Sequence, residues 1–495
     1  MRRERVLVGV LCALAALRVL VLSAGFPLFN NVDEYHHFDY VWKCAHGELP
    51  GPMQKLSPRV ATVIALYCWM PDYQSSKETI RFGQVLPPVW TLPKDVRDIA
   101  FPIWQARFAS QKNHESVQPP VYYLAAGLWY RFGALLHIPD RLLPFWVRLL
   151  NVPMVAILVW VSYRLAKLLF PRNTFLRLGT PLMISVLPQD VFYSISNGTL
   201  GAVLFTVALY ALALVYLNEN GRYGLHAAAG LAVGATVTTM YTSSPILLVV
   251  GAVALACILR ARKTGTLRAA LRKLLVLCAA AALLPAIWCV RNYYVFGEVT
   301  AMPAFVRYAN WKPLPFAEMW DHPVFTAEGA LCFWSDTLAS YFRGEFVWHG
   351  KQMAYPWLDA FYVWSSPVFL LIAFGSFLRR GKPARFAGLM SAALFATSVA
   401  MLIGASMRYD FGSWFWPSRD YPYYSAGRLI LHTIVPFVFL YLTGLEVMLE
   451  TTRLGWLKFP VLIAVCGLML GSEIALSLPV FAAKCNFFHL LRLRA

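Results

Sequence analysis

The sequence predicts an all-α protein that crosses a membrane many times. Of its 495 residues, 59% are hydrophobic and 14% are charged, which is too apolar for an ordinary soluble enzyme. The apolar residues form long runs, and about eleven of these runs are long enough to cross a bilayer as helices. The formal net charge of +19 comes largely from short basic clusters between the runs. Such clusters are typical of cytoplasmic loops and do not indicate a nucleic-acid partner.

The first predicted span covers residues 6–26 and follows the basic start Met1-Arg2-Arg3-Glu4-Arg5. This arrangement superficially resembles a secretory signal. However, Arg18 interrupts the apolar run, and the run is longer than the core of a typical signal peptide. We therefore expect an uncleaved span whose basic end lies in the cytoplasm.

A large extracytoplasmic loop is predicted at residues 27–141. Short helices at residues 38–45 and 99–108 are expected to rest on the membrane surface. Residues 119–136 are apolar enough to cross, but the segment is short and contains Arg131. If it crossed, the basic loops 260–273 and 379–385 would face outward, against the positive-inside bias. We therefore expect it to lie along the outer surface.

The other predicted spans lie on both sides of a second long extracytoplasmic segment, residues 295–357. This segment is rich in Trp and Tyr, as expected where side chains meet lipid headgroups or a sugar. The whole chain, 1–495, is expected to form one integral membrane domain, and the side on which its basic C-terminal tail lies stays open. The spans are predicted at about 143–170, 178–196, 200–217, 225–242, 245–259, 274–290, 362–377, 386–407, 429–449 and 459–480.

Several titratable side chains follow the first span directly, and they include Asp33, Glu34, His36 and His37. Carboxylates at a membrane surface are costly unless they have a partner or a task, so Asp33 and Glu34 are candidate catalytic residues. The alternative is an interfacial helix cap. The two histidines could bind a metal or a phosphate, although adjacent histidines without a third ligand are often interfacial polar residues.

This acidic pair, together with the later sequence Gln118-Pro119-Pro120-Val121-Tyr122-Tyr123, resembles the start of the GT-C fold glycosyltransferases. That family includes the dolichyl-phosphate-mannose protein mannosyltransferases and the bacterial aminoarabinose lipid A transferases. The resemblance implies a GT-C-like fold and a sugar donor carried on a polyprenyl phosphate. It also implies that the acidic pair supplies the catalytic carboxylate and that the Pro-Pro motif opens a surface helix.

Glycosyl transfer needs a base for the acceptor hydroxyl and cations for the phosphate leaving group. Asp33 is the expected base, and Glu34 is expected to tune it or to bind the acceptor. Asp190 is a third candidate because an intramembrane acid is costly, although it could instead join two helices by a hydrogen bond. Related sequences often carry an acid where this chain has Gly198, which shifts weight to Asp190.

Arginines at the outer ends of three spans are candidate phosphate ligands, because guanidinium groups match phosphate oxygens and stay charged. Each of them could instead snorkel to lipid headgroups. No obligatory cofactor is predicted, and a divalent metal could bind. The residues expected to bind substrate are His36, His37, Gln118, Tyr122, Arg148, Asn197, Arg291 and Arg428.

These observations predict a hexosyl- or pentosyltransferase that uses a polyprenyl-phosphate sugar and a glycan, lipid or protein acceptor. We expect it in a bacterial inner membrane with its active site facing outward. The inverting course of the reaction is implied by the family resemblance. The alternatives are a transporter or flippase of lipid-linked or envelope substrates, and a non-catalytic assembly protein. Transporters generally show repeated halves, and no repeat is visible here.

Overall fold

The computed structural model describes residues 2–67, 89–218, 221–348, 351–482 and 486–490. Across these residues the fold is helical apart from four two-residue strands in two antiparallel pairs. Strand β1 (Lys312–Pro313) pairs with β4 (Tyr409–Asp410), and β2 (Val347–Trp348) pairs with β3 (Lys351–Gln352). The all-helical prediction is confirmed. Residues 68–88 of the predicted first loop lie outside the described residues.

In the described part of the chain, nine helical segments are long and apolar enough to cross a membrane, which indicates a multi-pass membrane protein. They occupy nine of the predicted spans. The predicted spans at 178–196 and 225–242 hold shorter helices, α9 (Thr174–Val186) and α11 (Tyr223–Val237), so the count of eleven stays a prediction. The nine segments are Arg2–Gly25, Leu143–Leu169, Gly198–Leu217, Tyr241–Thr264, Leu267–Phe296, Pro356–Arg379, Pro383–Met407, Gly427–Thr451 and Gly455–Phe481.

Helix α18 (Ile434–Thr451) lies at the centre of the largest apolar core, packed against α16 (Pro356–Arg379), α17 (Lys382–Met407) and α9. Its sequence is apolar on nearly every face, and a helix of that kind is stable only when surrounded. Gly444 permits the close packing, because a Cβ there would lie 2.1 Å from the carbonyl oxygen of Phe369 in α16.

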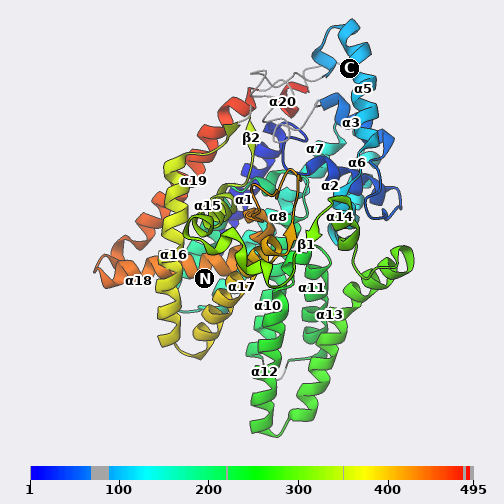
Figure 1. Cartoon of the computed structure of the whole chain (residues 1–495). Helices are drawn as coiled ribbons and strands as arrows, with labels where there is room; N and C mark the ends of the chain where they lie inside the picture. Colours follow the sequence, from blue (N-terminus) through cyan, green and yellow to red (C-terminus); the bar gives the residue numbers. More distant parts are fainter. Residues whose placement is uncertain (1, 68–88, 219–220, 349–350, 483–485, 491–495) are drawn as a thin grey trace.

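The predicted first loop folds into helices that share a second apolar core (Figure 1). These are α2 (Glu34–Ala45), α3 (Pro58–Tyr67), α5 (Lys94–Ser110) and α6 (Val121–Leu135). The helices predicted at 38–45, 99–108 and 119–136 are all present, the first two as parts of longer helices. Helix α6 begins directly after Pro119-Pro120, where proline favours a helix start. The position of these helices relative to a bilayer stays a prediction.

Four consecutive helices form a group that extends away from the rest of the molecule (Figure 1). They are α10 (Gly198–Leu217), α11, α12 (Ile246–Thr264) and α13 (Leu267–Phe296). Gly230 and Gly234 of α11 face α13, and a Cβ on Gly230 would lie 2.2 Å from the carbonyl oxygen of Leu277. Small residues four apart therefore let these two backbones approach closely, as they often do in membranes.

The remaining helices connect these groups. The predicted second long segment contains α14 (Met302–Tyr308) and α15 (Ala327–Arg343), and a 3-10 helix, η7 (Gly427–Thr433), leads into α18. The other α-helices are α1 (Arg2–Gly25), α7 (Leu143–Arg148), α8 (Asn151–Leu169), α19 (Lys458–Phe481) and α20 (Phe487–Leu490). The other 3-10 helices are η1 (Val89–Thr91), η2 (His114–Val117), η3 (Asp190–Tyr193), η4 (Tyr241–Ser243), η5 (Glu318–Asp321), η6 (Pro323–Phe325) and η8 (Gly455–Leu457).

Candidate active site

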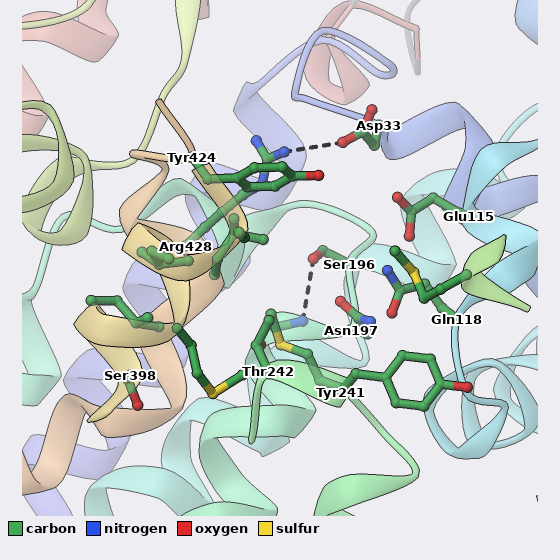
Figure 2. A pocket seen from close by; sticks show the side chains of 18 of the residues that line it. Asp33, Glu115, Gln118, Ser196, Asn197, Tyr241, Thr242, Ser398, Tyr424 and Arg428 are labelled. Atoms are coloured by element: carbon green, nitrogen blue, oxygen red, sulfur yellow. Dashed lines mark hydrogen bonds and ion pairs between the residues drawn. The ribbon is translucent and has the colours of Figure 1, made fainter. Parts of the chain in front are cut away.

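A cavity of about 320 Å³ lies where the start of α2, η2, the start of α10, the end of α17 and η7 come together. Five of the predicted site residues line it, and they come from segments far apart in the sequence. Polar side chains lie around much of the cavity (Figure 2), and apolar side chains complete its lining. The predicted residues in the lining are Asp33, His37, Gln118, Asn197 and Arg428.

The backbone at Asp33 separates this residue from its neighbour Glu34. Asp33 has a φ of 62°, in the left-handed region that aspartate tolerates better than most residues, and it immediately precedes α2. The turn directs the Asp33 side chain into the cavity, whereas Glu34 begins α2 and is fully buried. The two adjacent carboxylates therefore occupy different environments.

Asp33 makes two charged contacts in the cavity. One oxygen lies 3.0 Å from His114 Nε2, and the other accepts a hydrogen bond from Arg428 Nη2 at 3.1 Å. Figure 2 shows Asp33 and Arg428 pointing toward one another. Burial alone would raise the pKa of Asp33, but His114 and Arg428 outweigh it and hold this pKa well below its usual range. The same pairing raises the pKa of His114 against the opposing effect of burial.

Arg428 also donates to Glu345, with Nη1 2.7 Å from Oε2, so its guanidinium bridges two carboxylates. Glu345 is in turn held by Asp190, whose Oδ2 accepts a hydrogen bond from the Glu345 backbone N–H at 2.7 Å. Asp190 lies on η3 and not in a helical span, and it does not line the cavity. Burial, together with the nearby negative charge of Glu345, raises the pKa of Asp190 to about 7.

The predicted histidines have different surroundings. His37 lines the cavity, with Nδ1 2.8 Å from the hydroxyl of Tyr123 and 3.5 Å from a carboxylate oxygen of Glu115. His36 is buried, and its ring centroid lies 4.0 Å from that of His114. Burial lowers the pKa of both residues, so each is mainly neutral near pH 7.

Glu34 and Arg148 form an ion pair outside the cavity lining. Arg148 donates from Nε and Nη2 to the two carboxylate oxygens, both at 2.6 Å, and its other N–H groups reach the carbonyl oxygens of Ser23, Phe26 and Pro27. All of the guanidinium nitrogens thus have protein partners, and Arg148 is 1% exposed. This geometry gives the pair a structural role, and we leave both residues out of the proposed site.

Two other residues expected to bind substrate do not line the cavity. Tyr122 is buried in α6, and burial raises the pKa of its hydroxyl. Arg291 donates from Nη2 to the carbonyl oxygens of Leu49 and Pro50 at 2.9 and 3.0 Å and stacks on Trp288. Arg291 therefore joins α13 to the loop after α2, and we leave Tyr122 and Arg291 out of the proposed site as well.

Sequence reasoning missed three charged residues near Asp33: His114, Glu115 and Glu345. The signal for the first two was their position, because Asn113-His114-Glu115 comes just before the Gln118-Pro119 motif. Asp33, His114 and Glu115 each offer a ligand atom within 4.8 Å of the others. One imidazole nitrogen and two carboxylate oxygens are donors that Zn²⁺ and Mn²⁺ accept, so these residues fit a divalent cation.

Neither the search of protein-family models nor that of curated proteins found a match. Among solved structures, the chain is similar to the oligosaccharyltransferase of Archaeoglobus fulgidus in complex with Zn and sulfate, with 13% identity and a TM-score of 0.41 over 94% of this chain and 53% of that one. It is also similar to the AglB oligosaccharyltransferase of the same organism bound to an inhibitory peptide and a dolichol-phosphate, with 10% identity and a TM-score of 0.41 over 94% and 55%. The chain spans about half the length of these proteins, and a likeness this low carries no functional argument.

Proposed function

We propose that the protein is a membrane glycosyltransferase that moves a sugar from a polyprenyl-phosphate carrier to an acceptor hydroxyl. One observation carries the proposal: a carboxylate, Asp33, and a guanidinium, Arg428, meet within a single cavity. A base and a cation for a phosphate leaving group are the two functions that this transfer needs. The family resemblance of the Asp33-Glu34 and Gln118–Tyr123 segments points to the same chemistry.

The cavity suits a substrate that is polar at one end and apolar at the other. Its apolar wall includes Met401, Leu402 and Ala405 of α17, a helix long and apolar enough to cross a membrane. Its polar wall contains Asp33, Glu115, Gln118 and Arg428. A sugar phosphate on a polyprenyl chain has the same division, so its head group can meet the charged residues while its chain follows α17.

The reaction is a displacement at the anomeric carbon of the donor sugar. The acceptor oxygen forms a bond to this carbon as the bond between the carbon and the phosphate oxygen breaks. Asp33 takes the proton of the acceptor hydroxyl, and the lipid phosphate leaves with the bonding electron pair. Arg428 stabilises the negative charge that the phosphate gains. The inverting course follows from the family resemblance.

The low pKa of Asp33 is compatible with this role. In a transition state with oxocarbenium character the leaving group departs early, so the acceptor hydroxyl becomes acidic and a weak base is sufficient. When Arg428 turns to the donor phosphate, Asp33 loses one positive neighbour and its pKa rises, while His114 remains beside it. Donor binding would therefore make Asp33 a better base.

The neighbouring residues position these two groups. Glu345 holds the Arg428 guanidinium from the side opposite Asp33, and Asp190 fixes the backbone of Glu345. If a divalent cation binds, Asp33, His114 and Glu115 would hold it, and it would supply positive charge beside the phosphate. We place the site on the outer face of a bacterial inner membrane, with a glycan, lipid or protein as the acceptor.

The direct test uses purified protein with a panel of polyprenyl-phosphate hexoses and pentoses and a membrane extract as the acceptor source. We expect one donor to give both free polyprenyl phosphate and a glycosylated product. Asp140→Asn is the matched control for changes at Asp33, because Asp140 is an exposed aspartate paired with Arg59. If the protein carries a lipid-linked sugar across the bilayer of proteoliposomes and forms no glycosylated product, it is a transporter or flippase.

A further inference from the structure

A second cavity, of about 340 Å³, lies at the far end of the four-helix group. Gly198, the first residue of α10, lines the candidate active site, whereas Asn218, directly after the last residue of α10, lines this second cavity. The 20 residues of α10 span about 30 Å, which is the thickness of a bilayer core. The two cavities therefore lie at the two ends of a helix long enough to cross a membrane, and we expect them at its opposite surfaces.

The charge around the second cavity is strongly positive. Arg260 at the end of α12 and Lys273 near the start of α13 both line it, and none of the described residues in its lining is acidic. Between Glu219 and Glu298 the sequence contains no Asp or Glu. Four further basic residues flank the two that line the cavity: Arg262, Lys263, Arg268 and Arg272. Such an excess of positive charge attracts anions.

Contacts between helices hold the residues around this cavity in place. Arg260 Nη1 donates to the carbonyl oxygen of Tyr216 at 2.9 Å, and its guanidinium carbon lies 5.2 Å from the centre of the Tyr216 ring. The contacts of Gly230 and Gly234 with α13 hold the neighbouring helices together. The position of the Arg260 charge is therefore fixed before any ligand arrives.

The outer faces of the two helices that border the cavity are apolar, which favours a lipid over a small soluble anion. Leu255 and Leu259 on α12 and Leu271 and Leu275 on α13 are exposed, and none of these four leucines lines the cavity. Helices α12 and α13 are among the least buried of the candidate spans, since 28% and 17% of their apolar windows are covered by protein. An anionic head group in the cavity would thus leave its acyl chains against an uncovered apolar surface.

We propose that this cavity binds the phosphate head group of an anionic phospholipid from the membrane leaflet opposite the candidate active site. Arg260 and Lys273 contact the phosphate, and the acyl chains leave the cavity to lie along the apolar outer surface of α12 and α13. Basic pockets between helices at a membrane surface are suited to such head groups. This site is independent of the proposed glycosyl transfer and would stand without it.

The test is a titration of the purified full chain in detergent, followed by native mass spectrometry. The probes are palmitoyl-oleoyl phosphatidylglycerol, palmitoyl-oleoyl phosphatidylcholine and glycerol 3-phosphate. We expect phosphatidylglycerol to bind more tightly than the other two. The double variant Arg260→Gln/Lys273→Gln should weaken this binding by about ten- to thirtyfold, because each basic residue near a membrane surface contributes roughly fivefold.

The matched control is Arg379→Gln/Arg385→Gln, which removes two exposed charges from another basic segment outside the cavity lining. It should bind phosphatidylglycerol like the unaltered protein, and Arg260→Lys/Lys273→Arg should also retain binding. If Arg260→Gln/Lys273→Gln fails to fold, Lys273→Gln alone should still lower the affinity for phosphatidylglycerol about fivefold. Equal binding of the two lipids, equally tight binding of glycerol 3-phosphate, or an unchanged affinity in the cavity variants would overturn the proposal.

Discussion

Asp33 and Glu34 are neighbours in the chain, yet their ion pairs are of different kinds. Glu34 is fully buried, and besides Arg148 it accepts hydrogen bonds from the backbone N–H groups of Phe29 and Ile195, at 2.8 and 2.9 Å. Asp33 faces a cavity and meets Arg428, a guanidinium that also serves Glu345. The Glu34–Arg148 pair is buried away from the cavity. In the Asp33–Arg428 pair, a ligand in the cavity can take the place of one partner. In the proposed mechanism, access to the cavity and not charge alone distinguishes Asp33 from Glu34.

The largest expected effect on stability comes from breaking the buried Glu34–Arg148 pair. Arg148→Met should leave Glu34 buried without its cation and lower the free energy of unfolding by about 3–5 kcal/mol. The double variant Arg148→Met/Glu34→Gln should recover part of this loss, because the uncompensated charge is gone. Unfolding curves in a mild detergent would measure both changes. A stable Arg148→Met protein whose defect is weak donor binding would instead assign Arg148 to the phosphate.

Substitution of Arg428 in the Asp33–Arg428 pair should weaken binding of the sugar donor. Arg428→Gln removes the proposed phosphate ligand, and losing a charge-assisted contact of about 1.5–3 kcal/mol should weaken donor binding roughly ten- to a hundredfold. The unfolding temperature should fall less than in Arg148→Met, because the Arg428 side chain is 19% exposed, so donor affinity is measured per folded molecule. Donor titrations of this variant and of Arg419→Gln, an exposed arginine paired with Asp410, provide the measurement. Equal donor affinities in the two variants would remove Arg428 from the site.

A further expected effect is a dependence of stability on pH at Asp190. Its pKa is raised from 3.8 to about 7 by burial, so the folded protein holds this proton more tightly than the unfolded chain. The stabilisation is complete below about pH 4 and is lost as pH rises toward 7. Asp190→Asn should therefore be less sensitive to pH across this window, whereas Asp140→Asn should behave like the unaltered protein. Parallel pH profiles for Asp190→Asn and the unaltered protein would contradict this account.

Much of the fold could be predicted from the sequence, because long apolar runs must be helical in a membrane. The early end of α9 at Val186 had a local signal in Pro188, because the residue before a proline disfavours helical backbone, but hydropathy alone extended the predicted span past Asp190. Asp33 and Arg428 were predicted from their positions next to apolar runs. Their contact was not, because 394 residues separate them and the approach depends on tertiary packing.

The opposite orientations of Asp33 and Glu34 also had no sequence signal. Two adjacent residues must point in different directions, but the pattern does not tell which one faces the cavity. The left-handed backbone at Asp33 decides this, and aspartate is one of several residues that tolerate it. In the same way, Arg148 and Arg428 both lie next to apolar runs, and only their three-dimensional partners distinguish a structural guanidinium from an available one.

The most direct test of the central claim compares Asp33→Asn with Glu34→Gln in one assay of glycosylated product per folded molecule. Asp33→Asn keeps the shape of the side chain but cannot take the acceptor proton, so its rate per folded molecule should fall by about 10² to 10⁴. Glu34→Gln should lose stability and retain most of its activity per folded molecule. Full product formation by Asp33→Asn would contradict the account.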